Sequence, residues 1–540
     1  MARIRFLPVK TAKTVEKVMQ AKQAAKGTGS TRPSRGAGPG TRGWSGRGGG
    51  MAQLVPSVRE YRGTTVQVCG LWPFSSGASS PMIGVPLGRH EETRATVCCD
   101  PISWFQRARL ISNPSAFILG KPGLGKSTLV RRMFLGLSAQ GIHPLVLGDL
   151  KGEHVKAVQA LGGQVIRLGR GVGYLNILDP GQAVEAAGLL EDHGHHEAAA
   201  RVRADAHGRR LNMVVSLITI SRNSPPTDQE QTILDRALRV LDERFEGIPV
   251  LQDLLDVIVC APDELRQVAL DRGDMKIYLR ETRALEATLL GLTGGGKLGE
   301  IFSRQTTNPM KRDRAVVFDV SSIDETETDL QAAVLLACWS YGFGTVNVAN
   351  ALADAGLEPR RNYFVVLDEL WRALRSGKGM VDRVDALTRL NRSVGVGQIM
   401  ISHTMSDLLA LPAEEDRMKA RGFVERSGMV ICGGLPASEM RLLTSAIPLS
   451  RQEQQKLISW QDPPVWDSRG LDVEPPGRGK FLIKVGGRPG IPVRIALTII
   501  EQAGGLNDTD TRWNKERIEM PAEAPMEPAA PRMPDEGGPR

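Results

Sequence analysis

A glycine-rich run, GKPGLGKST, occupies residues 120–128. It matches the pattern GxxxxGK followed by Ser or Thr, in which glycines let backbone N–H groups surround a β-phosphate that side chains would exclude. We expect the ammonium of Lys126 to lie between the β- and γ-phosphates and the hydroxyl of Ser127 to ligate Mg²⁺. The run predicts a site for ATP with Mg²⁺, with these contact residues: Gly120, Lys121, Pro122, Gly123, Leu124, Gly125, Lys126, Ser127 and Thr128.

A second run, GLTGGGKL at residues 291–298, fits the same pattern except at its last position. Leu298 offers Mg²⁺ no oxygen, and the residues before the run have helical periodicity rather than the character of a strand. We interpret this second run as a turn or mobile loop.

Two adjacent acids, Asp368 and Glu369, follow the apolar run YFVVL at residues 363–367. A buried parallel strand delivers its C-terminal residues to the ligand edge of the sheet. We expect Asp368 to hold a magnesium-bound water and Glu369 to polarise the attacking water as general base. Asp319 also follows an apolar run, but it lacks an acidic neighbour, and we interpret it as structural. The pair predicts that ATP is hydrolysed as well as bound.

Two further polar residues flank the apolar run at residues 397–402. The strand that this run predicts would lie beside the strand before the glycine loop, so His403 would emerge near the γ-phosphate. There it would sense that group, unless it is a strand-end histidine bonded only to backbone. Arg392 is either an arginine finger that reaches a neighbouring subunit's nucleotide in a ring, or a solvated surface arginine.

The elements that position these residues follow a βαβ alternation, which is typical of a parallel sheet. Strand-type runs occupy residues 116–119, 144–147, 315–320, 363–367, 397–402 and 428–431, and a helical run occupies 127–139. Further β-type runs lie at residues 65–68, 82–85, 94–98, 479–485 and 493–498. We predict an α/β fold of the RecA-like P-loop NTPase type, with a parallel central sheet, an all-α insertion and a small β-rich N-terminal part.

The predicted domain boundaries follow from these changes in pattern. They are a disordered basic tail at 1–50, a small β-rich part at 51–112, the first part of the ATPase core at 113–182, an all-α insertion at 183–300, the second part of the core at 301–501 and a disordered Pro/Glu-rich tail at 502–540.

Positive charge is concentrated in residues 1–50, which carry eleven Lys or Arg and the single acid Glu16. The whole chain has a formal net charge of +9, so the remainder is close to neutral and a basic body made for nucleic acid is not indicated. The tail either keeps the protein soluble or binds nucleic acid or anionic lipid.

The cysteines, histidines and apolar runs indicate an intracellular protein without a metal centre of its own. Six cysteines have no zinc-type spacing, which is typical of reduced thiols in the cytosol. His193, His195, His196 and His207 could suggest a metal site, but we interpret the HGHH run at residues 193–196 as a surface loop between helical segments. We find no apolar run approaching the ~18–20 residues that span a bilayer and no signal peptide, and therefore expect a cytoplasmic protein.

The ordered set of motifs resembles the HerA/FtsK superfamily, and within it the conjugative type IV secretion ATPases of the TraC/TrbE kind, the VirB-type assembly ATPases. The resemblance covers roughly residues 65–500. Its motifs are GKPGLGKST, DLKGE at 149–153, NILDP at 176–180, VVLDE at 365–369, the RSVG…ISH segment ending at His403, the WPF segment from Trp72, and GGLP at 433–436.

The resemblance implies a homo-hexameric motor with nucleotide at its subunit interfaces, working with membrane components of a type IV secretion channel at the inner face of the cell membrane. It places Lys126 and Ser127 as the phosphate and magnesium residues, Asp368 and Glu369 as the acid pair, and Arg392 as the trans-acting arginine. The family usually has Gln where this chain has His403.

Three functions stay open on these grounds. The first is an ATPase that energises conjugative DNA transfer, and the second is a translocase or coupling protein that pumps DNA itself, through the basic tail or a ring pore. The third is a nucleotide-gated assembly scaffold that rarely hydrolyses ATP. Intact Glu369 argues against the scaffold, and the missing N-terminal membrane helices argue against a coupling protein.

Overall fold

The computed structural model describes residues 81–294, 296, 298–375, 380–389, 395–463, 475–503 and 505–507. The chain divides into two compact units, Met1–Trp72 and Pro73–Arg540, and all the described residues belong to the second. The basic tail, the β-type run at 65–68, Trp72, Arg392 and the tail beyond residue 507 lie outside the described residues.

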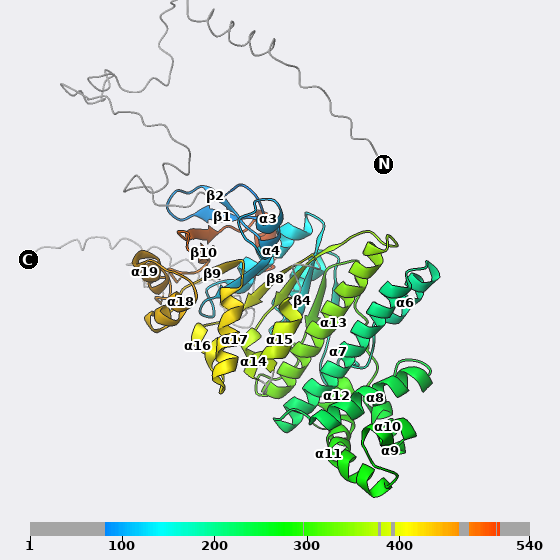
Figure 1. Cartoon of the computed structure of the whole chain (residues 1–540). Coiled ribbons are helices and arrows are strands. Elements are labelled where there is room, and N and C mark those ends of the chain that lie inside the picture. The colour runs from blue at the N-terminus through cyan, green and yellow to red at the C-terminus, as the bar shows by residue number, and fades with distance from the viewer. Residues whose placement is uncertain are drawn as a thin grey trace, which may run out of the picture. The chain divides into compact units, whose positions relative to one another are not determined.

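One sheet of eleven strands runs through the described part of the chain, in the order β2-β1-β11-β10-β9-β3-β8-β7-β4-β6-β5 (Figure 1). Neighbours from β9 to β5 are parallel, and neighbours from β2 to β9 are antiparallel. The strands are β1 (Pro86–His90), β2 (Thr96–Cys98), β3 (Ser115–Leu119), β4 (Ile142–Asp149), β5 (Gln164–Arg167), β6 (Val316–Asp319), β7 (Asn362–Leu367), β8 (Val396–Ile401), β9 (Met429–Cys432), β10 (Lys480–Lys484) and β11 (Ile491–Ile495).

Helices cover both faces of the parallel part, so its strands are apolar throughout rather than alternating. In β3, Ala116 and Ile118 pack in one core with α3 (Pro101–Gln106), α4 (Lys126–Ser138) and α5 (Val155–Ala160). Phe117 and Leu119 face the opposite core, which contains α13 (Thr328–Asp354). The result is the three-layer α/β arrangement that the βαβ pattern predicts.

The structure contains the following further helical elements. They are α6 (Ala183–Asp192), α7 (His196–Arg222), α8 (Asp228–Arg244), α9 (Leu251–Cys260), α10 (Asp263–Val268), α11 (Met275–Thr293), α12 (Gly299–Phe302), α14 (Leu370–Arg375), α15 (Met380–Arg389), α16 (Met405–Leu409), α17 (Glu414–Glu425), the 3₁₀ turn Ala437–Glu439, α18 (Met440–Ala446), α19 (Arg451–Ser459) and α20 (Ile499–Ala503).

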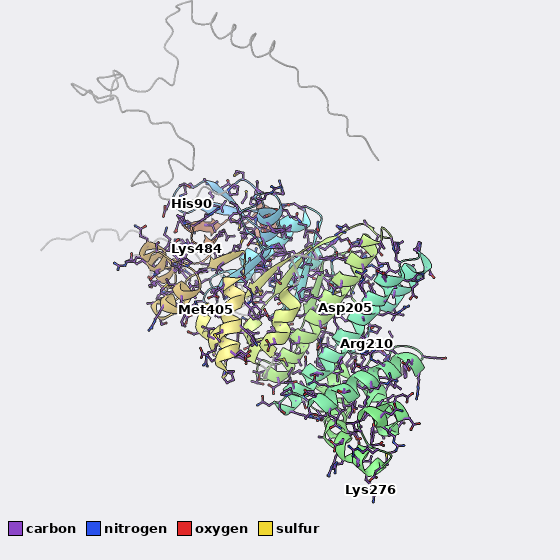
Figure 2. All side chains as sticks on the ribbon, viewed as in Figure 1. His90, Asp205, Arg210, Lys276, Met405 and Lys484 are labelled. Atoms are coloured by element: carbon purple, nitrogen blue, oxygen red, sulfur yellow. The ribbon has the colours of Figure 1, made fainter. Side chains whose placement is uncertain are left out.

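Helices α6 to α12 occupy residues 183–302, the stretch with helical periodicity. Figure 2 labels Asp205 and Arg210 on α7, which lies against the core, and Lys276 near the outer end of the helical segment. Because α11 continues to Thr293, the second glycine run begins inside a helix rather than after a strand. Gly295 and Lys297 of that run lie outside the described residues.

Helix α13 corrects one expectation from the sequence. Its 27 residues are long and apolar enough to cross a membrane by length and composition, although no such run was expected. The apolar window is 94% buried inside the protein, so the helix forms part of the core. A core helix surrounded on all sides has no polar face, and composition alone does not separate it from a membrane span.

One strand prediction was also wrong, and one strand was not predicted. Residues 82–85 form no strand, because the chain turns there and Val85 donates its N–H to the Asp100 carboxylate at 3.0 Å; β1 begins at Pro86. The sequence also gave no signal for β5, which has only four residues and two polar ends.

A charged cluster joins α7 to α8. The ring of His207 lies between two carboxylates, with Nε2 at 2.7 Å from Asp235 and Nδ1 at 3.5 Å from Asp242. Each acid also pairs with an arginine, Asp242 with Arg210 at 2.6 Å and Asp235 with Arg239 at 3.0 Å. The hydrogen bond to Asp242 is the largest cause that raises the pKa of His207 above its usual value.

We predict that His207→Gln destabilises the protein more at pH 6 than at pH 9. A histidine whose pKa is raised on folding contributes its full stability below the unfolded pKa and loses it as the pH rises through the folded pKa. Thermal unfolding followed by circular dichroism should show that the variant melts roughly 2 °C below the wild type at pH 6. The expected difference is small because solvent partly screens the charges of the cluster. An equal or larger deficit at pH 9 would contradict this assignment.

Candidate nucleotide-binding site

Four neighbouring parallel strands, β3, β8, β7 and β4, end at the same edge of the sheet. The glycine loop follows β3, His403 follows β8, Asp368 and Glu369 follow β7, and Lys151 follows β4. In open α/β sheets this carboxyl edge is where ligands bind. The expected position of the β8 strand beside β3 is confirmed by their parallel register.

The glycine loop is held by backbone hydrogen bonds to three other segments. Gly120 donates its N–H to the carbonyl of His403 at 2.9 Å, and Lys121 donates to the carbonyl of Gly434 at 3.0 Å. The carbonyl of Leu124 accepts the N–H of Gly479 at 3.0 Å. These bonds fix the loop from both sides without using a side chain.

The loop has the backbone conformation that a phosphate cradle needs. Gly123 and Gly125 have φ values of 79° and 94°, in the left-handed region that glycine adopts without steric cost. Gly125 is the N-cap of α4 and has no side chain to cap it, so the first N–H groups of the helix point to the ligand edge. Such a helix N-terminus favours a phosphate, and the open glycine loop leaves the backbone N–H groups free of side chains that would exclude one.

Lys126 bridges the loop to the rest of the site. Its Nζ donates to the carbonyls of Gly120 at 2.7 Å and Lys121 at 3.2 Å, and it lies 3.1 Å from Nδ1 of His403. Burial lowers the pKa of Lys126 to about 8, and the carboxylates of Asp368 and Glu369 oppose that fall. The side chain therefore stays mostly protonated at pH 7.

The two acids at the end of β7 have different environments. The Asp368 carboxylate accepts the N–H of Glu369 at 2.9 Å, and loss of water contact, followed by repulsion from Glu369, raises the pKa of Asp368 to about 7. Glu369 is a buried non-glycine residue with φ at 50°. Left-handed backbone at such a residue costs roughly 1–2 kcal/mol and is concentrated at functional sites.

Four donors surround the Glu369 carboxylate. Trp371 donates its indole N–H to Oε2 at 2.6 Å, and Nε2 of His403 lies 3.4 Å from the same oxygen. Nζ of Lys151 is 3.6 Å from Oε1, and Nε of Arg372 is 4.0 Å from Oε2. Sequence reasoning gave no role to Lys151, Trp371 or Arg372.

His403 stands between Lys126 and Glu369. Burial lowers the pKa of His403 below its ordinary value, so the ring is neutral near pH 7. A neutral ring that accepts from Lys126 at Nδ1 carries its proton on Nε2, facing Glu369; we assign this tautomer from the partners. The position near the phosphate edge is as expected, and the role of sensor stays a prediction.

Asp319 lies apart from these residues. The Asp319 carboxylate accepts from the hydroxyl of Ser321 at 2.6 Å and pairs with Arg167 at 3.6 Å, and β4 separates its strand from β7. This agrees with a structural interpretation. Arg392 lies outside the described residues, so its role as an arginine finger stays a prediction.

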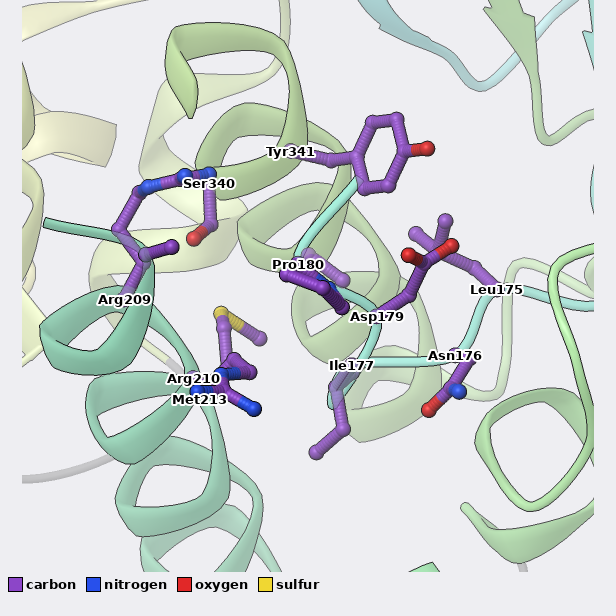
Figure 3. A pocket seen from close by; sticks show the side chains of 12 residues that line it. Leu175, Asn176, Ile177, Asp179, Pro180, Arg209, Arg210, Met213, Ser340 and Tyr341 are labelled. Carbon is purple, nitrogen blue, oxygen red and sulfur yellow. The ribbon is translucent and has the colours of Figure 1, made fainter. Parts of the chain in front are cut away.

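Four residues of the NILDP segment, Asn176, Ile177, Asp179 and Pro180, line a small cavity between α7 and α13 (Figure 3). Its volume is about 20 Å³, which admits about one water molecule. Asn176 donates its side-chain amide to the carbonyl of Pro249 at 2.8 Å, and Asp179 accepts from Thr306 at 2.9 Å. The segment therefore joins the helical part to the core.

Comparison with known proteins agrees with this geometry. The model of the family described as "Helicase HerA, central domain" matches residues 93–338, a span that includes the glycine loop and Lys151. The solved structure of VirB4 from Thermoanaerobacter pseudethanolicus has the same fold, with a TM-score of 0.57, at 19% identity over 79% of this chain and 100% of that chain. Residues 93–338 are therefore similar to the HerA central domain, and the chain has the fold of VirB4.

Weaker structural matches include the plasmid coupling protein TrwB in complex with ADP and Mg²⁺. Its TM-score is 0.43, at 14% identity over 71% of this chain and 85% of that chain. The cytoplasmic domain of the type VII secretion ATPase EccC from Thermomonospora curvata has a TM-score of 0.30, at 15% identity over 79% of this chain and 30% of that chain. No curated protein sequence matches the chain.

Proposed function

We propose that this chain is an ATP-hydrolysing motor that energises conjugative DNA transfer through a type IV secretion system. The observation that carries the proposal is the juxtaposition of Lys126, Glu369 and His403 at the carboxyl edge of four adjacent strands. The VirB4 likeness, which extends over 79% of the chain, supports the choice of secretion system. The working place would be the cytoplasm, at the inner face of the cell membrane.

The side chains divide the chemistry among them. The glycine loop and Lys126 would bind the phosphates of ATP, and Ser127 and Asp368 would hold Mg²⁺, which neutralises phosphate charge when bound. Glu369 would accept the proton of the attacking water. Neutral His403 links Lys126 to Glu369 and would report the state of the phosphate site to the end of β8.

The motor would act as a homo-hexamer, with Arg392 of one subunit reaching the nucleotide of the next. Its partners would be membrane components of the secretion channel. A coupling protein would instead contact DNA directly. In this chain the DNA would bind to the basic tail of residues 1–50 or in the pore of the ring.

The test is ATP turnover by the purified full-length protein with no DNA, with single-stranded DNA and with double-stranded DNA, each over a series of salt concentrations. Turnover that DNA leaves unchanged is expected of a secretion motor. Stimulation of several-fold that falls steeply with salt would replace this proposal with a DNA translocase. A variant in which the eleven basic residues of the tail are changed to glutamine shows whether stimulation by DNA depends on the tail.

A further inference from the structure

The loop after β4 brings a second lysine to the candidate site. Nζ of Lys151 lies 3.6 Å from Oε1 of Glu369, across two neighbouring parallel strands. The Glu369 side chain is only 6% exposed, whereas the Lys151 side chain is 45% exposed. One partner is thus fixed inside the site, and the other reaches into it from the solvent side.

The loop that presents Lys151 is held rigidly. The buried Asp149 carboxylate accepts the backbone N–H of Glu153 at 3.0 Å and of His154 at 2.7 Å, which closes the loop around Lys151. Gly152 has φ at 67°, a conformation that a residue with a Cβ adopts only at a steric cost. The Asp149 hydrogen bonds and the left-handed Gly152 therefore fix the backbone on the C-terminal side of Lys151.

The same loop is tied to the helix that begins at the phosphate loop. Arg131 of α4 is 2% exposed, and its Nη1 donates to the carbonyl of Glu153 at 2.8 Å. Its Nη2 donates to the hydroxyl of Thr128, at 3.3 Å. The two cations of the site, Lys126 and Lys151, are therefore carried by segments that are bonded to each other.

We propose that Lys151 is a second phosphate-binding cation, which leaves Glu369 and contacts the γ-phosphate when ATP binds. This inference rests on the proposed ATPase function and adds a residue to its site. A general base lies ~2.6–3.2 Å from the water it activates, and that water lies ~3–3.5 Å from the atom it attacks. The γ-phosphate is therefore within about 6 Å of Glu369, a distance that the flexible arm of Lys151 spans.

The charges of the site explain why Lys151 would leave Glu369 for the γ-phosphate. A carboxylate base that faces an anionic phosphate is repelled by it, and this repulsion is strong where water is excluded. His403 does not offset that repulsion, because it is neutral near pH 7. Arg372 is already engaged, since it donates to Gln331 on α13 and stacks on the Trp371 ring at 5.0 Å. Lys151 is the exposed cation beside Glu369.

The movement of Lys151 from Glu369 to the γ-phosphate would distinguish ATP from ADP. ADP lacks the γ-phosphate, so Lys151 stays paired with Glu369 and contributes nothing to ADP binding. Lys151→Ala should weaken binding of a non-hydrolysable ATP analogue at least about tenfold and leave ADP affinity within about twofold. It should lower kcat by about 10²-fold, the size expected on loss of one preorganised group that stabilises transition-state charge.

The experiment measures the Kd of the analogue and of ADP by calorimetry, and kcat and KM by phosphate release. The control is Lys156→Ala, an exposed lysine on the following helix, and Lys151→Arg should recover most of the analogue affinity. Melting temperatures establish that the variants are folded. An equal loss of ADP and analogue affinity, or no loss of either, would overturn the proposal.

The affinity measurements separate this inference from the proposed function. If the wild-type protein binds ATP but releases no phosphate, the proposed motor function is wrong. The affinities for the analogue and for ADP still test the role of Lys151 in that case. If turnover is normal and Lys151→Ala behaves like Lys156→Ala, the motor stands and the inference fails.

Discussion

Replacing Glu369 with glutamine should lower kcat by about 10³-fold and leave Mg·ATP affinity within a few-fold of wild type. The carboxylate is the base that we assign to the attacking water, and general base catalysis typically contributes 10²–10⁴-fold. Glutamine keeps the volume of the side chain and an oxygen that accepts the indole N–H of Trp371, now at 2.6 Å. Binding should survive because the phosphates lie on the glycine loop rather than on Glu369.

Phosphate release and nucleotide Kd, measured on the same preparations, test this expectation. Glu325→Gln, at an exposed acid in the loop after β6, is the matched control. Turnover within a few-fold of wild type in Glu369→Gln would show that another group activates the water.

Lys126→Ala should abolish measurable turnover and weaken ATP binding by more than tenfold. The ammonium supplies the point charge for the β- and γ-phosphates, and loss of one such group costs about 10²–10³-fold in rate even before binding is considered. The substitution also removes the bonds from Nζ to the carbonyls of Gly120 and Lys121, at 2.7 and 3.2 Å, which tie the two ends of the loop together.

Lys156→Ala serves as the control for loss of a positive charge, because that lysine lies on the exposed side of α5. Nucleotide titrations and phosphate release again give the readouts. Normal ATP affinity in Lys126→Ala would mean that ATP binds elsewhere on the protein.

Much of the site could be predicted from local sequence patterns. The glycine loop, the acid pair and His403 each follow a short apolar run, and parallel strands deliver their ends to one edge. That Lys126 and His403 come within 3.1 Å follows from β3 and β8 being neighbours, which the alternation of elements indicated.

The groups around Glu369 were not predictable in the same way. Lys151 and Glu369 meet because β4 and β7 pair, and no feature of either segment alone specifies that pairing. Trp371 turns back onto Glu369 because the backbone at Glu369 is left-handed, a conformation without a sequence signal at a glutamate. DLKGE was recognised as a motif, but its lysine had no assigned partner.

Helix α13 and strand β5 were the least predictable elements. Helix α13 lacks the polar face that marks an amphipathic helix, so its length and composition resemble those of a membrane span. Strand β5 is short and polar at both ends, and its place in the sheet comes from pairing with β6 rather than from its own residues. Both elements are defined by their neighbours.

Phosphate release from Mg·ATP by the purified wild-type protein tests the central claim most directly. The measurement is made over a range of protein concentrations, so that ring assembly does not limit turnover, with Lys126→Ala measured in parallel. We predict saturable turnover that requires Mg²⁺ and is lost in the variant. Tight ATP binding without phosphate release at any protein concentration would contradict the motor and leave a nucleotide-gated scaffold.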